Sequence, residues 1–134
     1  MTALASALSN EKETILLISH NATRTGAPIL AWNICEQLKQ RYNVICVLLR
    51  GGEIVPFKQT CAYVVGPFEE HLLLCAGATI SAIKKRFGIK FAIINSYESK
   101  LVLKSIAANA IPSIFLIHEF LNDSHLEDFY LKLK

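Results

Sequence analysis

Five short apolar runs, separated by polar segments that carry glycine or proline, recur along the 134-residue chain. Runs rich in Ile, Leu and Val, without a polar residue at every second position, are typical of strands buried on both faces of a parallel sheet. Glycine and proline between the runs favour turns at their ends. The pattern therefore predicts strands over residues 14–19, 43–50, 62–65, 91–95 and 113–118.

Between these runs the apolar residues follow helical spacing. Leu30, Ile34 and Leu38 share one face of a predicted helix over residues 28–41, and Pro28 suits its first turn. Gly88 ends a second predicted helix, and a capping-box pattern at 124–127 begins the last one. The predicted helices span 28–41, 69–87, 96–109 and 126–133.

Strands that alternate with helices predict an α/β fold with a Rossmann-like parallel sheet of about five strands and helices on both faces. The expected strand order is 3-2-1-4-5, the common arrangement for such a sheet. Residues 1–13 are predicted to form a flexible leader, and residues 14–134 a single domain.

Composition narrows the class of protein. Hydrophobic residues make up 52% of the chain, which is enough for a buried core and excludes disorder. The net charge of +3 is too small to indicate nucleic-acid binding, but it is compatible with an anionic ligand or an acidic lipid surface. Neither a signal peptide nor an apolar segment long enough to span a bilayer is found. We therefore expect a cytoplasmic protein, for which peripheral contact with the inner membrane face is open.

The basic residues at 84–86 have two interpretations, cations at a helix end or a patch for an acidic lipid acceptor. The cysteines, at positions 35, 46, 61 and 75, fall in apolar runs without the spacing of a metal site. We expect buried free thiols in a reducing compartment, and no metal.

Polar segments follow three of the predicted strands and form the candidate site. They comprise residues 20–27, 95–97 and 118–119. In a doubly wound sheet the carboxyl ends of the strands meet at one edge, and a crevice opens where the winding reverses. The helix start after Gly26 offers unpaired backbone N–H groups, which favour phosphate. The sequence thus predicts an anion site at this edge.

Each candidate residue also has a simpler interpretation. Gly26 could serve only the geometry of a turn, because no dinucleotide fingerprint, P-loop or nucleophile elbow surrounds it. His118 could contact a ligand or pack at the sheet edge, and His20 is the next candidate. His71 and His125 are expected to be solvated. Trp32 and Phe57 either border the cleft or belong to ordinary packing.

Taken in order, four segments resemble the N-terminal domain of family-4 glycosyltransferases. They read ILLISHNATRTGAPILAWNICEQL, LLRGGEIVPF, FAIINS and IFLIHEF, and the resemblance covers roughly residues 14–120. These retaining enzymes have two Rossmann-like domains, the GT-B fold. The resemblance implies transfer of a sugar from a nucleotide-sugar to a sugar or lipid-linked acceptor, with no cofactor and no metal.

The resemblance also implies roles for residues of this chain. Gly26 and Ala27 would reach the donor diphosphate, and His118 would act as the catalytic residue beside the transferred sugar. Glycines that are paired in much of the family are reduced here to Gly26. The further candidates for binding the donor diphosphate or the acceptor are His20, Thr25, Asn95, Ser96 and Glu119.

The family's C-terminal donor domain, with its Arg, Lys and two glutamates eight residues apart, has no counterpart in this chain. Glu119 and Glu127 share that spacing, which we attribute to chance. The chain alone is therefore expected to be inactive, and an incomplete sheet edge would favour a homodimer. The alternatives are a non-catalytic Rossmann-like binding or assembly module and a small nucleotide-binding enzyme complete in itself.

Overall fold

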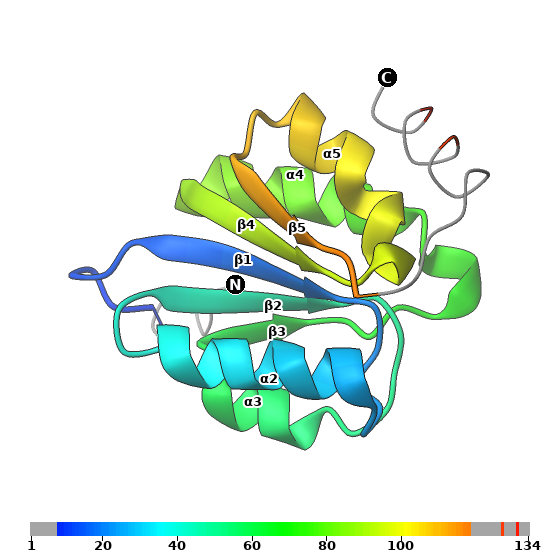
Figure 1. Ribbon diagram of the computed structural model, residues 1–134. Helices are drawn as coiled ribbons and strands as arrows, with labels where there is room; N and C mark the ends of the chain where they lie inside the picture. Colours follow the sequence, from blue (N-terminus) through cyan, green and yellow to red (C-terminus); the bar gives the residue numbers. More distant parts are fainter. Residues whose placement is uncertain (1–7, 119–126, 128–130, 132–134) are drawn as a thin grey trace.

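The computed structural model describes residues 8–118, 127 and 131 and contains one five-stranded parallel sheet (Figure 1). The strand order is β3-β2-β1-β4-β5, so the predicted fold class and strand order are confirmed. The strands are β1 (Thr14–Ser19), β2 (Asn43–Leu48), β3 (Tyr63–Val65), β4 (Ile89–Asn95) and β5 (Ser113–Leu116).

The central strand β1 is buried along its whole length. It pairs with β2 from Thr14↔Asn43 to Ser19↔Leu48, and with β4 up to Ser19↔Asn95. Alternate side chains point to opposite faces of the sheet, and both faces are covered by helices. In Figure 1, α2 and α3 lie on one face, and α4 and α5 lie on the other.

The helices α2 (Gly26–Leu38) and α3 (Val55–Thr60) form the first layer. Ala31 and Cys35 of α2 and Phe57 of α3 pack against Ile15 and Leu17 of β1. The bounds predicted for this first helix, 28–41, differ from those observed, because α2 starts at Gly26 and ends at Leu38. The sequence analysis missed α3, whose six residues are too few to show a helical period.

The second layer contains α4 (Cys75–Phe87), α5 (Leu103–Ala108) and two 3-10 helices, η1 (Glu70–Leu72) and η2 (Tyr97–Val102). The continuous helices predicted over 69–87 and 96–109 were wrong at their starts, because each begins with a 3-10 turn before the α-helix. Gly88 ends α4 with a φ of 60°, as predicted, and β4 follows at once.

Residues 8–13 are attached to the domain, so this part of the predicted leader is not free. Asn43 at the start of β2 makes the attachment. Its Nδ2 donates to the carbonyls of Ser9, at 2.8 Å, and Lys12, at 3.0 Å. Its Oδ1 accepts from the Ser9 N–H at 2.9 Å. Residues 1–7 lie outside the described part.

The last described strand, β5, pairs with β4, and its Ile114 is 54% exposed. Glu119, His125 and most of the predicted helix over 126–133 lie outside the described residues, although Glu127 and Leu131 are helical. The homodimer stays a prediction. Within the described part of the chain, no helix has the length and apolar character needed to cross a bilayer.

We predict that Asn43→Ala lowers the free energy of unfolding by about 1–3 kcal/mol, because the change removes three partly buried hydrogen bonds to Ser9 and Lys12. Urea denaturation followed by circular dichroism measures this loss. Asn33→Ala, at an exposed position of α2, is the matched control and should leave stability unchanged or slightly higher. Equal effects of the two changes would contradict the attachment.

Candidate functional site

Asn95, at the end of β4, joins the segments that follow β1 and β5. Its Nδ2 donates to the backbone carbonyl of Ala27 in the first turn of α2, at 2.6 Å. Its Oδ1 lies 2.7 Å from Nε2 of His118, just after β5. The structure thus brings Ala27, Asn95 and His118 together at the carboxyl edge of the sheet, where the sequence predicted that these three segments meet.

These contacts fix the protonation of the imidazole nitrogen that faces Asn95. A backbone carbonyl only accepts hydrogen bonds, so the amide nitrogen of Asn95 must point to Ala27. The amide oxygen then faces His118 and can only accept, which places a proton on Nε2. Asn95 is fully buried and His118 is exposed, so a rigid group orients a ring at the surface.

The start of α2 is open. Thr25 is its N-cap residue with extended backbone, but its side chain bonds Oγ1 of Thr23 at 2.9 Å and caps no helix N–H. Gly26 does not have a positive φ, and a Cβ added there would meet no atom within 4 Å. Turn geometry and packing therefore do not require a glycine here, which leaves close approach of a ligand as a reason for it.

Two further candidates lie at the same edge. Ser19 and Asn95 are paired in register, so His20 and Ser96 follow neighbouring strands at the same level. His20 is half-buried. Ser96 is fully buried with a φ of 77°, a left-handed conformation that is costly for a residue other than glycine. Its hydroxyl accepts from the N–H of Glu98 at 3.2 Å and so caps η2.

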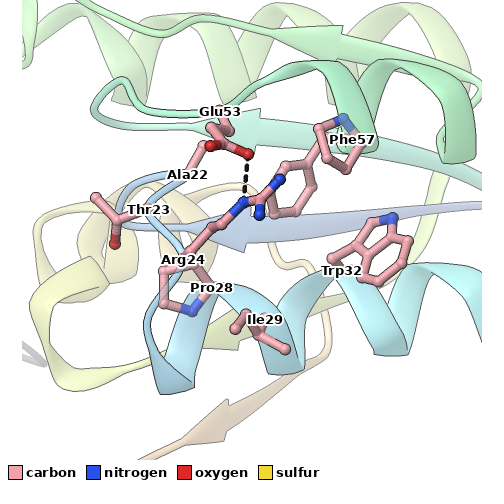
Figure 2. Close-up of a pocket in the computed structure, with 9 residues that line it drawn as sticks. Ala22, Thr23, Arg24, Pro28, Ile29, Trp32, Glu53 and Phe57 are labelled. Atoms are coloured by element: carbon pink, nitrogen blue, oxygen red, sulfur yellow. Dashed lines mark hydrogen bonds and ion pairs between the residues drawn. The ribbon is translucent and has the colours of Figure 1, made fainter.

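A cavity of about 300 Å³ lies beside this edge, between α2, α3 and the loops after β1 and β2 (Figure 2). Its wall is mostly apolar, with one ion pair at the mouth. Trp32 and Phe57 border it, and both also take part in the packing of α2 and α3 on the sheet. The lining residues are Ala22, Thr23, Arg24, Pro28, Ile29, Trp32, Glu53, Pro56 and Phe57.

The polar groups of the cavity come from both loops. Nε of Arg24 donates to Glu53 at 2.6 Å, but both side chains are more than half exposed, so the pair contributes less than about 1 kcal/mol to stability. The indole N–H of Trp32 donates to Oγ1 of Thr60 at 2.9 Å, which fixes the ring against α3. A ring-shaped ligand with polar edges fits such a lining.

Close contact between the two loops holds the mouth of the cavity. The N–H of Ala22 donates to the Gly51 carbonyl at 3.1 Å, and the N–H of Glu53 donates to the Ala22 carbonyl at 2.8 Å. Gly52 has a φ of 142°, and a Cβ there would lie 2.5 Å from the Ala22 carbonyl carbon. The sequence analysis did not name Arg24, Glu53 or Pro56 as site residues. The available signal for the second loop was the glycine pair at 51–52, four residues before Pro56, which marks a turn after β2.

The remaining candidates divide as follows. Cys35, Cys46 and Cys61 are buried free thiols, as predicted, whereas Cys75 is exposed, so the prediction was wrong there. Cys75 is the first residue of α4 and faces away from the core. His71 is exposed, as predicted. Among the described residues, no group of three His, Cys, Asp or Glu side chains could hold a metal ion.

Comparisons with known proteins bear on the fold alone. No protein-family model and no curated protein matches the chain. A similar solved structure is the C-terminal domain of a hydrogenase from Pyrococcus furiosus, with a TM-score of 0.54 and 12% identity. The match covers 81% of this chain and 94% of that domain. At this identity the likeness supports the Rossmann-like architecture and carries nothing about activity.

We predict opposite effects of alanine at the two loop glycines. Gly26→Ala should leave the free energy of unfolding unchanged or raise it by about 0.4–1 kcal/mol, since the position is open and alanine restricts the unfolded chain. Gly52→Ala should lower it by at least about 1–3 kcal/mol, because its backbone conformation excludes a Cβ. Thermal and urea unfolding of both variants measures the difference. A destabilised Gly26→Ala variant would show that the glycine is structural.

Proposed function

We propose that this chain is the acceptor-side, N-terminal domain of a retaining GT-B glycosyltransferase that moves a sugar from a nucleotide-sugar donor to an acceptor. The observation that carries the proposal is the junction at Asn95, which links the start of α2 to His118. In the family that the sequence resembles, the corresponding two segments face the donor diphosphate and the transferred sugar.

The chemistry of retaining transfer suits these groups. The nucleoside diphosphate leaves with added negative charge while positive charge develops at the sugar carbon, so stabilisation of the leaving phosphates is the main demand. The uncapped start of α2 offers N–H groups of Gly26 and Ala27 to a phosphate oxygen. His118, oriented by Asn95, would lie beside the sugar. One helix start and one imidazole supply only part of the required charge, and a donor domain would supply the rest.

The cavity between α2 and α3 would receive part of the acceptor. Trp32 and Phe57 give it broad apolar walls, which suit the face of a sugar ring or the apolar part of a lipid-linked acceptor. Arg24 and Glu53 lie at its mouth and can exchange their mutual ion pair for bonds to hydroxyl or phosphate groups. This assignment rests on the proposed sugar transfer.

We predict that His118→Ala, in the protein as it is encoded together with any following domain, lowers kcat by roughly 10²–10³-fold. The melting temperature should fall by no more than roughly 5 °C, because the side chain is exposed and its removal costs one hydrogen bond to Asn95. Release of nucleoside diphosphate from a panel of nucleotide-sugars is the measurement. His71→Ala is the matched control, since His71 is an exposed histidine of η1 paired only at the surface with Glu69.

Two results would sink the proposal. The first is a His118→Ala variant that turns over at the rate of the unchanged protein. The second is an encoded protein that neither transfers nor hydrolyses any sugar of the panel. A coding sequence that stops after Lys134 would favour the non-catalytic binding module instead.

A further inference from the structure

Three of the four cysteines come together on the face of the sheet that α2 and α3 cover. Cys35 lies on α2, Cys46 on β2, and Cys61 directly after α3. The Sγ atoms of Cys35 and Cys61 are 3.3 Å apart. A disulfide needs about 2.05 Å, so the two sulfur atoms must approach each other by roughly 1.2 Å. The fold therefore holds two thiols ready to be joined.

A second cavity, of about 250 Å³, reaches one member of this cluster. Its lining includes Cys61, Lys12, Lys39 and Tyr42, but neither Cys35 nor Cys46. Cys61 is 8% exposed, whereas Cys35 and Cys46 are fully buried. A small solute that enters this cavity lies beside Cys61, with two lysines in the same wall.

The surroundings also favour the thiolate at Cys61. Hydrogen bonds from Cys35 and then Cys46 lower the pKa of the Cys61 thiol, and the charge of Lys39 lowers it further, against the effects of burial and of Glu36. Burial and hydrogen bonding to its neighbours raise the pKa of Cys46. A thiolate is the nucleophilic form of cysteine. The reactive form thus lies on the one thiol of the cluster that the cavity reaches.

Glu36 is a carboxylate near Cys61 whose oxygens are already bonded to other side chains. Hydrogen bonds from Lys39 and Thr60 hold the pKa of the Glu36 carboxyl below its ordinary value, so it stays ionised and bonded to those two partners. Lys12 donates to the Lys39 carbonyl at 3.0 Å, which ties the N-terminal segment to the end of α2 beside the cavity. The charged groups around Cys61 are therefore two lysines and one occupied carboxylate.

We propose that Cys61 and Cys35 form a redox couple, in which Cys61 is the site of attack by a hydroperoxide and Cys35 closes the disulfide. The Cys61 thiol first loses its proton to solvent, its thiolate attacks one peroxide oxygen, the O–O bond breaks, and the hydroxide or alkoxide that leaves takes up one proton from solvent, which balances the proton lost. The sulfur is oxidised to a sulfenic acid by two electrons. The Cys35 thiol then attacks this sulfur, forms the S–S bond and releases water. The couple does not depend on the proposed sugar transfer.

The test treats the whole reduced chain with hydrogen peroxide and maps the products by peptide mass spectrometry. The unchanged chain should lose two hydrogens and yield one disulfide, between Cys35 and Cys61. In Cys35→Ser the sulfenic acid should persist on Cys61 and react with dimedone. Cys75→Ser is the matched control, since Cys75 is exposed and outside the cluster, and it should form the same disulfide at an unchanged rate.

The pH dependence of the oxidation rate distinguishes a thiol with a lowered pKa from one that is only accessible to the peroxide. Between pH 8 and pH 6 the oxidation of Cys61 should slow by less than about threefold, whereas a thiol of ordinary pKa slows roughly 80-fold. In urea the preference for Cys61 should disappear. Prior oxidation of Cys75, a disulfide that includes Cys46 or Cys75, or a Cys61 that slows as an ordinary thiol does would each overturn the proposal.

Discussion

The rest of the structure depends on one constraint, that the backbone hydrogen-bonding groups of β1 must find partners. All six of its residues are buried, so every N–H and C=O group needs a partner from a neighbouring strand. Strands β2 and β4 supply these partners in parallel register. Parallel neighbours require connections that cross a face of the sheet. One connection runs through α2 and another through α4, on opposite faces of the sheet, so the segments after β1 and β4 meet at its carboxyl edge, where Asn95 bonds Ala27.

This constraint also explains how much the sequence could predict. A strand buried on both faces must be a continuous apolar run, and the runs over 14–19, 43–50 and 91–95 predicted β1, β2 and β4, although β2 ends at Leu48 and β4 begins two residues earlier, at Ile89. Strand order followed from the alternation of strands and helices, and with it the meeting of Ala27, Asn95 and His118. Helix starts were harder, because the short 3-10 turns η1 and η2 leave no helical period in the sequence, and only η2 has a side-chain cap, the Ser96 hydroxyl.

The cavity and the thiol cluster could not be predicted, for a different reason. Both are made by residues whose distance in space is set by α3, and α3 is too short to be seen as a periodic segment. The mouth of the cavity needs the close approach of Gly52 to Ala22, a tertiary contact. Likewise, the spacing of Cys35, Cys46 and Cys61 along the chain matches no motif. Only the packing of α2 and α3 on β2 brings their sulfur atoms together.

One helix connects the three features. Along α2, Gly26 lies at the carboxyl edge of the sheet, Trp32 borders the first cavity and Cys35 belongs to the thiol cluster. Thr60, next to Cys61, accepts from the Trp32 indole and donates to Glu36. The facing walls of the cavity belong to α2 and α3, and a Cys35–Cys61 bond would join α2 to the residue that follows α3. Oxidation would thus fix the separation of these walls, whereas the reduced pair leaves it to two side-chain hydrogen bonds and apolar packing.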